Sequence, residues 1–208
     1  MKENNNIIIT VGRQLGSGGR TIAKMLADDF DCKFYDRELL NLAAQESGFS
    51  EEIFEQNDEQ KGFLKSLFHL HAPHVSDTNF YNSRFSQESL FLFQSEAIRK
   101  AAATDSCVFV GRCADYVLRD RTDVVNVFIT ADLEERVKAV MQREDCNEDT
   151  ARRIISQKES QRANFYNYYT GKKWGHAESY ELCVNTSTIG MECVHQLLKQ
   201  YIEWRMNN

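Results

Sequence analysis

The sequence predicts an α/β fold with a five-stranded parallel sheet covered by helices on both faces. Five short apolar runs alternate with segments whose apolar residues recur at helical spacing. Because a parallel strand is reached only through a crossover connection, this alternation favours parallel pairing. The runs are also rich in Val and Ile, which suits strands buried on both faces. The 208 residues are enough for one domain with a sizeable core.

The first strand, residues 7–11, leads into a glycine-rich loop and then into a helix. The loop, residues 12–21, contains four glycines, at Gly12, Gly16, Gly18 and Gly19. Glycines let backbone N–H groups turn inward, and the start of a helix adds unpaired N–H groups and a positive dipole end. This order predicts a phosphate-binding site, although the same glycines could form an ordinary turn.

The loop departs from the common phosphate-binding pattern G-x-x-x-x-G-K-[ST]. Gly19 follows Gly18 where the pattern has lysine, and Arg20 comes one residue later, before Thr21. An arginine would act from a different angle, since it does not directly replace a compact ammonium group. Three nearby cations could supply the missing charge: Arg13, Arg20 and Lys24.

The second strand, residues 32–36, ends in Asp36 and is followed directly by Arg37. Helices are predicted next, from residues 37 to 44 and from residues 50 to 60. The second of these begins with a serine and two acids, which suit the start of a helix.

Residues 62–85 show no clean period, which favours a mobile loop or a partner surface. The spacing of His69, His71 and His74 could in principle bind a metal. No nearby acid or cysteine completes such a site, so we do not expect one.

The second half of the chain supplies the remaining strands and helices. The predicted strands are residues 107–110, 124–129 and 180–185. The predicted helices are residues 86–103, 114–118, 132–144, 147–165 and 189–206. Asp132 with Glu135 resembles a capping box, and Asn147 is placed to cap the next helix. Residues 166–175 are predicted to be an aromatic and basic loop. The last helix is expected to turn five residues inward: Val194, Leu197, Leu198, Tyr201 and Ile202.

In parallel α/β sheets, ligands bind at the carboxyl ends of the strands. These ends carry the glycine loop, the pairs Asp36–Arg37 and Gly111–Arg112, and Thr130. We therefore expect a phosphate loop, a carboxylate and two arginines to face one cleft.

The charge balance argues against a general nucleic-acid-binding protein. The net charge is −6, whereas affinity for a phosphate backbone needs a broad cationic face. No uncharged stretch approaches the ~20 residues that span a bilayer, so no membrane partner is expected. Residues 1–6 are polar and lack a signal-peptide pattern, which makes the cytoplasm the expected location.

The six cysteines are scattered and form no C-x-x-C pair, so we interpret them as reduced thiols. Three of them fall in or beside strand-like runs, where a thiol acts as a small core residue: Cys32, Cys107 and Cys183.

Taken in order along nearly the whole chain, these motifs resemble the cytidylate kinase-like family of P-loop nucleoside monophosphate kinases. The resemblance rests on the glycine loop and on residues 35–40, 110–112, 128–136 and 185–187. It implies a three-layer P-loop NTPase fold in a single domain, residues 1–208. A helical insert that binds the nucleoside monophosphate would span about residues 37–85, and a lid about residues 146–178.

The resemblance also implies a transferase that moves the γ-phosphoryl group of ATP to CMP or dCMP, with Mg²⁺ as cofactor and nucleotides as partners. Donor phosphates would bind to Gly12, Gly16, Ser17, Gly18, Gly19 and Thr21, with the Thr21 hydroxyl toward Mg²⁺. The acceptor would face Asp36, Arg37, Arg112 and Asp115. The catalytic cations would be Arg13, Arg20, Arg153, Lys158 and Arg162.

Phosphoryl transfer between two polyanions needs charge neutralisation and positioning more than it needs a covalent nucleophile. Arginines on separate elements are suited to this. The alternative for Arg153, Lys158 and Arg162 is a solvated helix face whose cations pair with Glu148, Asp149 and Glu159.

Two other functions remain open. The loop lacks its lysine, and Val110 stands where cytidylate kinases have an aspartate, so the chain could be a nucleotide-binding or regulatory protein without activity. It could also be a P-loop kinase for another small acceptor, because residues 51–85 do not identify the base. Aromatic residues in and after that segment favour a homodimer: Phe63, Phe68, Phe80, Tyr81, Phe85, Phe91 and Phe93.

Overall fold

The computed structural model describes residues 6–37 and 80–207. Its centre is a five-stranded sheet in the order β2-β3-β1-β4-β5, in which every pair of neighbouring strands is parallel. The strands are β1 (Ile8–Arg13), β2 (Lys33–Tyr35), β3 (Cys107–Val110), β4 (Val124–Thr130) and β5 (Leu182–Asn185). This arrangement confirms the α/β fold with a parallel sheet that the alternation of the sequence predicts.

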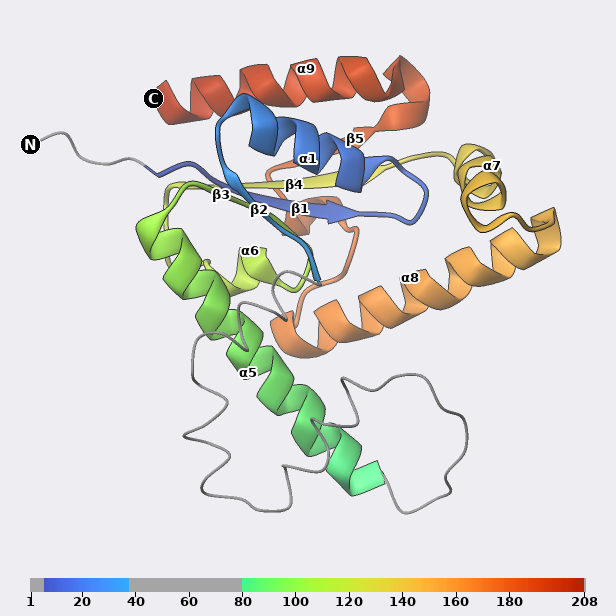
Figure 1. Ribbon diagram of the computed structural model, residues 1–208, viewed down its shortest axis with the longest axis horizontal. Coiled ribbons are helices and arrows are strands. Elements are labelled where there is room, and N and C mark those ends of the chain that lie inside the picture. Colours follow the sequence, from blue (N-terminus) through green and yellow to red (C-terminus); the bar gives the residue numbers. More distant parts are fainter. Residues whose placement is uncertain (1–5, 38–79, 208) are drawn as a thin grey trace, which may run out of the picture.

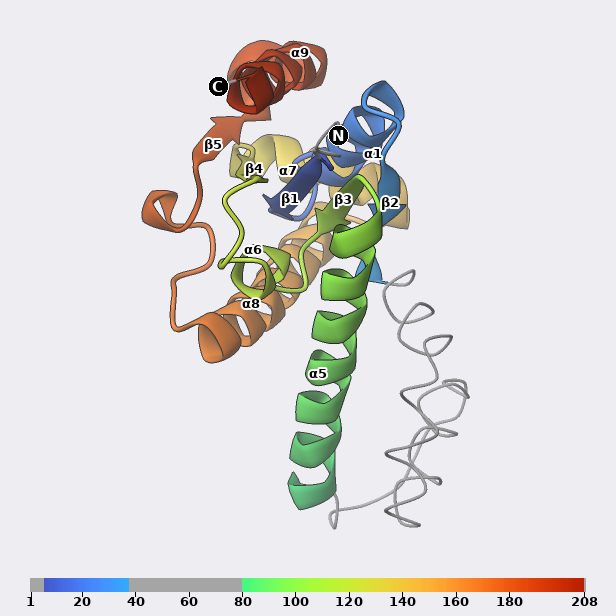
Figure 2. The ribbon, with the colours of Figure 1, turned by 90° about the vertical axis from the view of Figure 1, so that its left-hand side faces the viewer.

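Helices cover both faces of the sheet (Figures 1 and 2). Helices α1 (Gly19–Asp29) and α9 (Thr186–Asn207) lie on one face. The other face carries α5 (Phe80–Thr104), α6 (Ala114–Val117) and α8 (Glu148–Thr170). Helix α7 (Leu133–Glu144) packs against α8 beyond the end of β4, and a short 3₁₀ turn, η1 (Ala177–Ser179), precedes β5.

Side chains alternate between the two faces of the sheet, so the buried strand residues form one cluster on each face. Ile9 and Val11 of β1 pack with their neighbours against α1 and α9. Ile8 of the same strand points to the opposite face, where it packs with residues of α5 and α6. A third cluster joins Leu15, from the glycine loop, to the interface of α7 and α8. The loop is therefore fixed at the carboxyl end of a strand that is buried on both sides.

Some predicted helix bounds are wrong. Helix α8 continues to Thr170, so the first half of the predicted loop at residues 166–175 is helical, and the helix stops where Gly171 takes a left-handed φ of 69°. Helix α5 begins at Phe80 rather than at residue 86. Helix α9 begins at Thr186, with a kink at Gly190, whose φ is 81°.

Long-range contacts overturn three local predictions. The Asp132 side chain makes no capping bond and instead accepts from Asn185 Nδ2 at 2.9 Å, so the predicted capping box does not form. Leu197 is 41% exposed because it lies at the edge of the buried stripe of α9. Cys183 is an exposed thiol because β5 is an edge strand, although all six cysteines are free as predicted.

The predicted helices at residues 37–44 and 50–60, the three histidines, and Phe63 and Phe68 lie outside the described residues. Phe91, one of the aromatics assigned to a dimer interface, stacks within the chain on Tyr169, with ring centroids 3.8 Å apart. Within residues 6–37 and 80–207, none of the helices combines the length and apolar character needed to cross a membrane.

Leu198 and Leu197 form a matched pair for testing which face of α9 is buried. Leu198 is fully buried against the sheet, so Leu198→Ala should lower the free energy of unfolding by about 2–5 kcal/mol. Leu197→Ala should change it by less than about 0.5 kcal/mol. Chemical denaturation of both variants measures the difference, and equal losses would contradict this packing of α9.

Candidate functional site

The glycine loop connects β1 to α1 with two residues in the left-handed region. Gly16 has a φ of 82° and Gly18 a φ of 76°, and Gly18 occupies the N-cap position of α1. The first hydrogen bond of the helix runs from Ile22 N–H to Gly18 O at 3.0 Å. The N–H groups ahead of Ile22 have no partner within the helix, and the helix dipole adds positive potential. This geometry suits an anion.

Helix α8 holds the loop from one side. Glu159 Oε1 accepts hydrogen bonds from Leu15 N–H at 3.2 Å and from Arg136 Nη1 at 2.7 Å. Arg136, on α7, is buried and also donates to Ala131 O. The Thr186 hydroxyl donates to Ser17 O, which ties the loop to the start of α9. The glycine loop, α7 and α8 are thus joined through one carboxylate.

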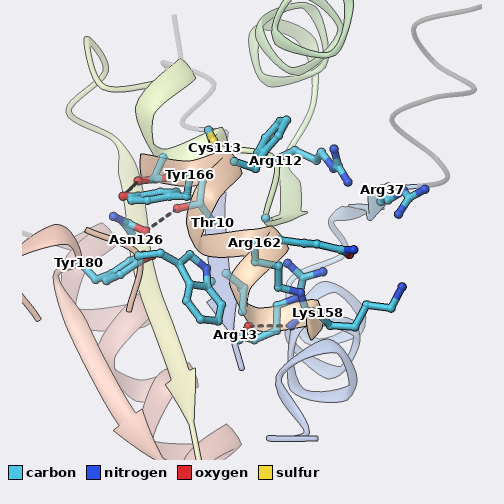
Figure 3. Close-up of a pocket in the computed structure, with 17 residues that line it drawn as sticks. Thr10, Arg13, Arg37, Arg112, Cys113, Asn126, Lys158, Arg162, Tyr166 and Tyr180 are labelled. Atoms are coloured by element: carbon cyan, nitrogen blue, oxygen red, sulfur yellow. Dashed lines mark hydrogen bonds between the residues drawn. The ribbon is translucent and has the colours of Figure 1, made fainter. Parts of the chain in front are cut away.

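A cleft of about 300 Å³ adjoins the loop at the carboxyl ends of β1 and β3 and runs beneath α8. One side of it is strongly basic, as Figure 3 shows. Its cations come from the end of β1, the residue after the buried Asp36, the turn after β3, and α8. They are Arg13, Arg37, Arg112, Lys158 and Arg162.

The partly buried arginines of the cleft repel one another. Burial, then the charges of Arg162 and Arg112, lower the pKa of Arg13 to about 9. Burial and nearby Arg37 lower the pKa of Arg112 to about 10. Arg13 and Arg112 therefore remain protonated at neutral pH, and the cleft is a concentrated positive site.

Polar and aromatic groups form the other side of the cleft (Figure 3). The Tyr166 hydroxyl donates to Asp115 Oδ2 at 2.7 Å. Burial raises the pKa of Asp115, while this hydrogen bond opposes the rise. Trp174 and Tyr180 complete this side of the cleft, which we call the aromatic wall, and both rings pack on Phe128. The Arg112 guanidinium makes a cation–π contact with the Phe165 ring, and its Cζ lies 4.9 Å from the ring centroid.

A model of the cytidylate kinase-like family matches residues 8–188 of this chain. The chain belongs to the cytidylate kinase-like family. Its curated relatives include proteins named cytidylate kinase from two species. The one from Ignicoccus hospitalis is 25% identical over 196 residues, which cover 94% of this chain and 98% of the relative. The one from Methanopyrus kandleri is 24% identical over 206 residues, covering 95% and 94%.

Solved structures agree with this family fold. An uncharacterised protein from Eubacterium ventriosum superposes with a TM-score of 0.73 at 26% identity, covering 95% of this chain and 99% of the other. A shikimate kinase from Bacteroides thetaiotaomicron superposes with a TM-score of 0.52 at 14% identity, covering 95% and 98%. The second likeness shows the P-loop kinase fold alone.

The structure brings together most of the site residues that the family resemblance implies. Five residues of the loop surround the helix start: Gly16, Ser17, Gly18, Gly19 and Thr21. Seven more line the cleft: Gly12, Arg13, Arg37, Arg112, Asp115, Lys158 and Arg162.

Three of the implied residues lie elsewhere. Arg20 binds Asp36 Oδ2 through Nε and Nη2, at 3.1 and 2.7 Å, so these two side chains satisfy each other beside the cleft. Arg153 is exposed and does not line the cleft. It lies nine residues before Arg162 on α8, which places it on the opposite face of the helix.

Sequence reasoning missed the aromatic wall and the role of Glu159. The sequence concentrates aromatic residues between Phe165 and Tyr180, which was the available signal. The pairing of Glu159 with Leu15 N–H joins residues 144 positions apart and has no local signal.

The pKa of Asp115 leads to a pH prediction for stability. Because its pKa in the folded state is raised above about 4, its value in an unfolded chain, this carboxyl costs stability as the pH rises through the folded pKa. Asp115→Asn should therefore gain stability relative to the unaltered protein between pH 4 and pH 7. Urea denaturation across that range measures this difference.

Asp123→Asn controls for the loss of one exposed carboxylate and should give a smaller pH-dependent difference. If the Asp115→Asn difference stayed constant from pH 4 to pH 7, the raised pKa would be contradicted.

Proposed function

We propose that this family member transfers the γ-phosphoryl group of ATP to the phosphate of a nucleoside monophosphate, with CMP or dCMP as acceptor. The observation that carries the proposal is the cleft that joins the glycine loop to partly buried arginines from three separate elements. The relatives named cytidylate kinase, about 25% identical over nearly their whole length, support the choice of acceptor.

The donor phosphates would bind at the start of α1. There the N–H groups of Gly16 to Thr21 and the helix dipole meet, and Gly16 and Gly18 take the left-handed conformations that such a loop needs. The basic side of the cleft begins at Arg13, next to this loop. A γ-phosphoryl group bound there would lie between the loop and the cleft.

Few side chains of the described part of the chain are placed to coordinate Mg²⁺. Thr21 is exposed in the first turn of α1, so its hydroxyl is available as a ligand. In the described part of the chain, no group of three or more His, Cys, Asp or Glu side chains is placed to bind a metal ion. Asp36 is engaged by Arg20. Mg²⁺ commonly uses one or two protein ligands with substrate phosphates and water, and it would neutralise charge on the transferred group.

The acceptor would occupy the cleft. Its phosphate would meet Arg37 and Arg112, which are suited to bidentate binding of phosphate oxygens. The aromatic wall offers a stacking surface for a base, and Asp115 with Tyr166 offers hydrogen-bonding groups at the far end. A volume of about 300 Å³ suits one small ligand rather than a polymer.

Helix α8 would act as part of the lid, at about residues 146–178. It presents Lys158 and Arg162 to the cleft, where two polyanions must be neutralised and water excluded. The insert at about residues 37–85 would bind the nucleoside monophosphate; only its first residue and its end belong to the described chain. Arg153 would contribute only if α8 turned.

A non-catalytic nucleotide-binding protein is the second candidate. Gly19 in place of the loop lysine and Val110 in place of an aspartate favour it, because each removes a charged group from the transfer site.

A coupled assay with ATP and Mg²⁺ over a panel of acceptors separates these functions. We expect turnover with CMP or dCMP to exceed turnover with AMP, GMP, UMP and small hydroxylated acceptors. Turnover with a different acceptor would identify a P-loop kinase of another specificity. ATP binding in calorimetry without transfer to any acceptor would favour the non-catalytic function.

Arg162→Ala should lower kcat/KM at least about tenfold, the ~1.4 kcal/mol scale of one charge-assisted contact. Arg162 is partly buried in the cleft, and its Nη1 donates to Arg13 O at 3.1 Å, so it is held where the phosphates would meet. Steady-state kinetics with CMP measures the loss.

Arg152→Ala is the matched control on the same helix. Arg152 is paired with Glu134 and Glu148 at the surface, and its removal should leave kcat/KM within about twofold. Equal effects of the two substitutions would argue against a role for Arg162.

A further inference from the structure

We infer that Arg13 binds the phosphate chain of the ligand, as the loop lysine does in the common pattern, and that Gly19 leaves the room that the Arg13 side chain needs. The cation and a glycine of the pattern have thus exchanged positions in this loop. With Gly18 as the second glycine of G-x-x-x-x-G-K-[ST], position 13 is the pattern's first glycine and position 19 its lysine. The chain has arginine at the first position and glycine at the second.

The two positions compete for the same space. A Cβ atom added to Gly19 would lie 2.5 Å from Arg13 Cβ, closer than real Cβ atoms approach one another. The backbone itself would accept a side chain there, because Gly19 has no positive φ and begins an ordinary helix. The second obstacle, Ile129 Cβ at 3.2 Å, needs a shift of only a few tenths of an ångström. Arg13 is therefore what excludes a lysine from position 19.

A second glycine clears the path of the Arg13 side chain. Arg13 Nη1 lies against Gly111, at the end of β3, where an added Cβ would meet the guanidinium. Gly111 also has a φ of 74°, which favours glycine. The long side chain of Arg13 thus passes between glycines on two separate elements. It ends at the junction of the loop and the cleft (Figure 3).

The surroundings of Arg13 call for an anion. Its guanidinium is largely withdrawn from solvent beside Arg162 and Arg112, and Asp36, the acid whose charge raises its pKa, also binds Arg20. A buried cation with like-charged neighbours is stabilised when a ligand brings negative charge. A guanidinium can bind two phosphate oxygens through a planar pair of parallel hydrogen bonds, whereas the ammonium group of a loop lysine acts as a compact point charge.

The inference rests on the phosphate-binding part of the proposed function and is independent of the acceptor. Calorimetry with ATP and with inorganic tripolyphosphate tests it, together with the melting temperature, on five variants. Arg13→Gly should weaken both ligands at least about tenfold, and Gly19→Lys should weaken them and lower the melting temperature because of the clash. The double variant Arg13→Gly/Gly19→Lys should recover the melting temperature and bind within about threefold of the unaltered chain.

The double variant Arg13→Gly/Gly19→Met is the matched control. It relieves the clash with a side chain of similar length and no charge, so it should recover the melting temperature but not the affinity. Arg13→Lys, which leaves position 19 untouched, guards against misfolding of the other variants and should bind more tightly than Arg13→Gly.

Three results would overturn the exchange. One is a lysine double variant that binds no more tightly than Arg13→Gly or than the methionine double variant. Another is a Gly19→Lys variant with unaltered melting temperature and affinity, and the third is an unaltered chain that binds neither probe. Neither probe needs an acceptor. If the chain bound both probes but phosphorylated no nucleoside monophosphate, the proposed acceptor would be contradicted, whereas the exchange between Arg13 and Gly19 would still hold.

Discussion

Repulsion among partly buried arginines is the constraint on which the candidate site depends. Arg13 extends from β1, Arg112 follows β3 and Arg162 comes from α8, yet all three lie in one cleft. Burial lowers the pKa of each, and the charges of Arg162 and Arg112 lower that of Arg13 further. Stability alone would not favour this arrangement, since each like charge raises the cost of burying the others. It becomes favourable when polyanionic ligands enter, which agrees with membership of a family of P-loop kinases.

The fold supplies the framework that holds these charges together. Parallel strands buried on both faces fix the ends from which Arg13 and Arg112 project. Helix α8 is attached to the same end by Glu159, which binds the loop at Leu15 N–H and Arg136 on α7 at the same time. Removal of Glu159 would leave Arg136 buried without its carboxylate, so this contact joins stability to the position of α8.

Local patterns in the sequence were enough to predict the parallel sheet, the glycine loop and the order of the elements. Strand burial and glycine turns both leave short-range signals in the sequence. Helix periodicity also held the information that Arg153 and Arg162, nine residues apart, face opposite ways. Contacts between distant segments could not be predicted. The Arg20–Asp36 pair, the aromatic wall that includes Trp174 and the exposure of Cys183 all depend on which elements become neighbours in the folded chain.

The most direct test of the central claim, that the cleft and the loop together bind two phosphorylated ligands, is a crystal structure with a non-hydrolysable ATP analogue and CMP. The account predicts donor phosphates on the N–H groups at the start of α1, with the Arg13 guanidinium within hydrogen-bond distance of a phosphate oxygen. The CMP phosphate should contact Arg112 in the cleft. Phosphates bound elsewhere, or an Arg13 side chain turned away from an occupied loop, would contradict it.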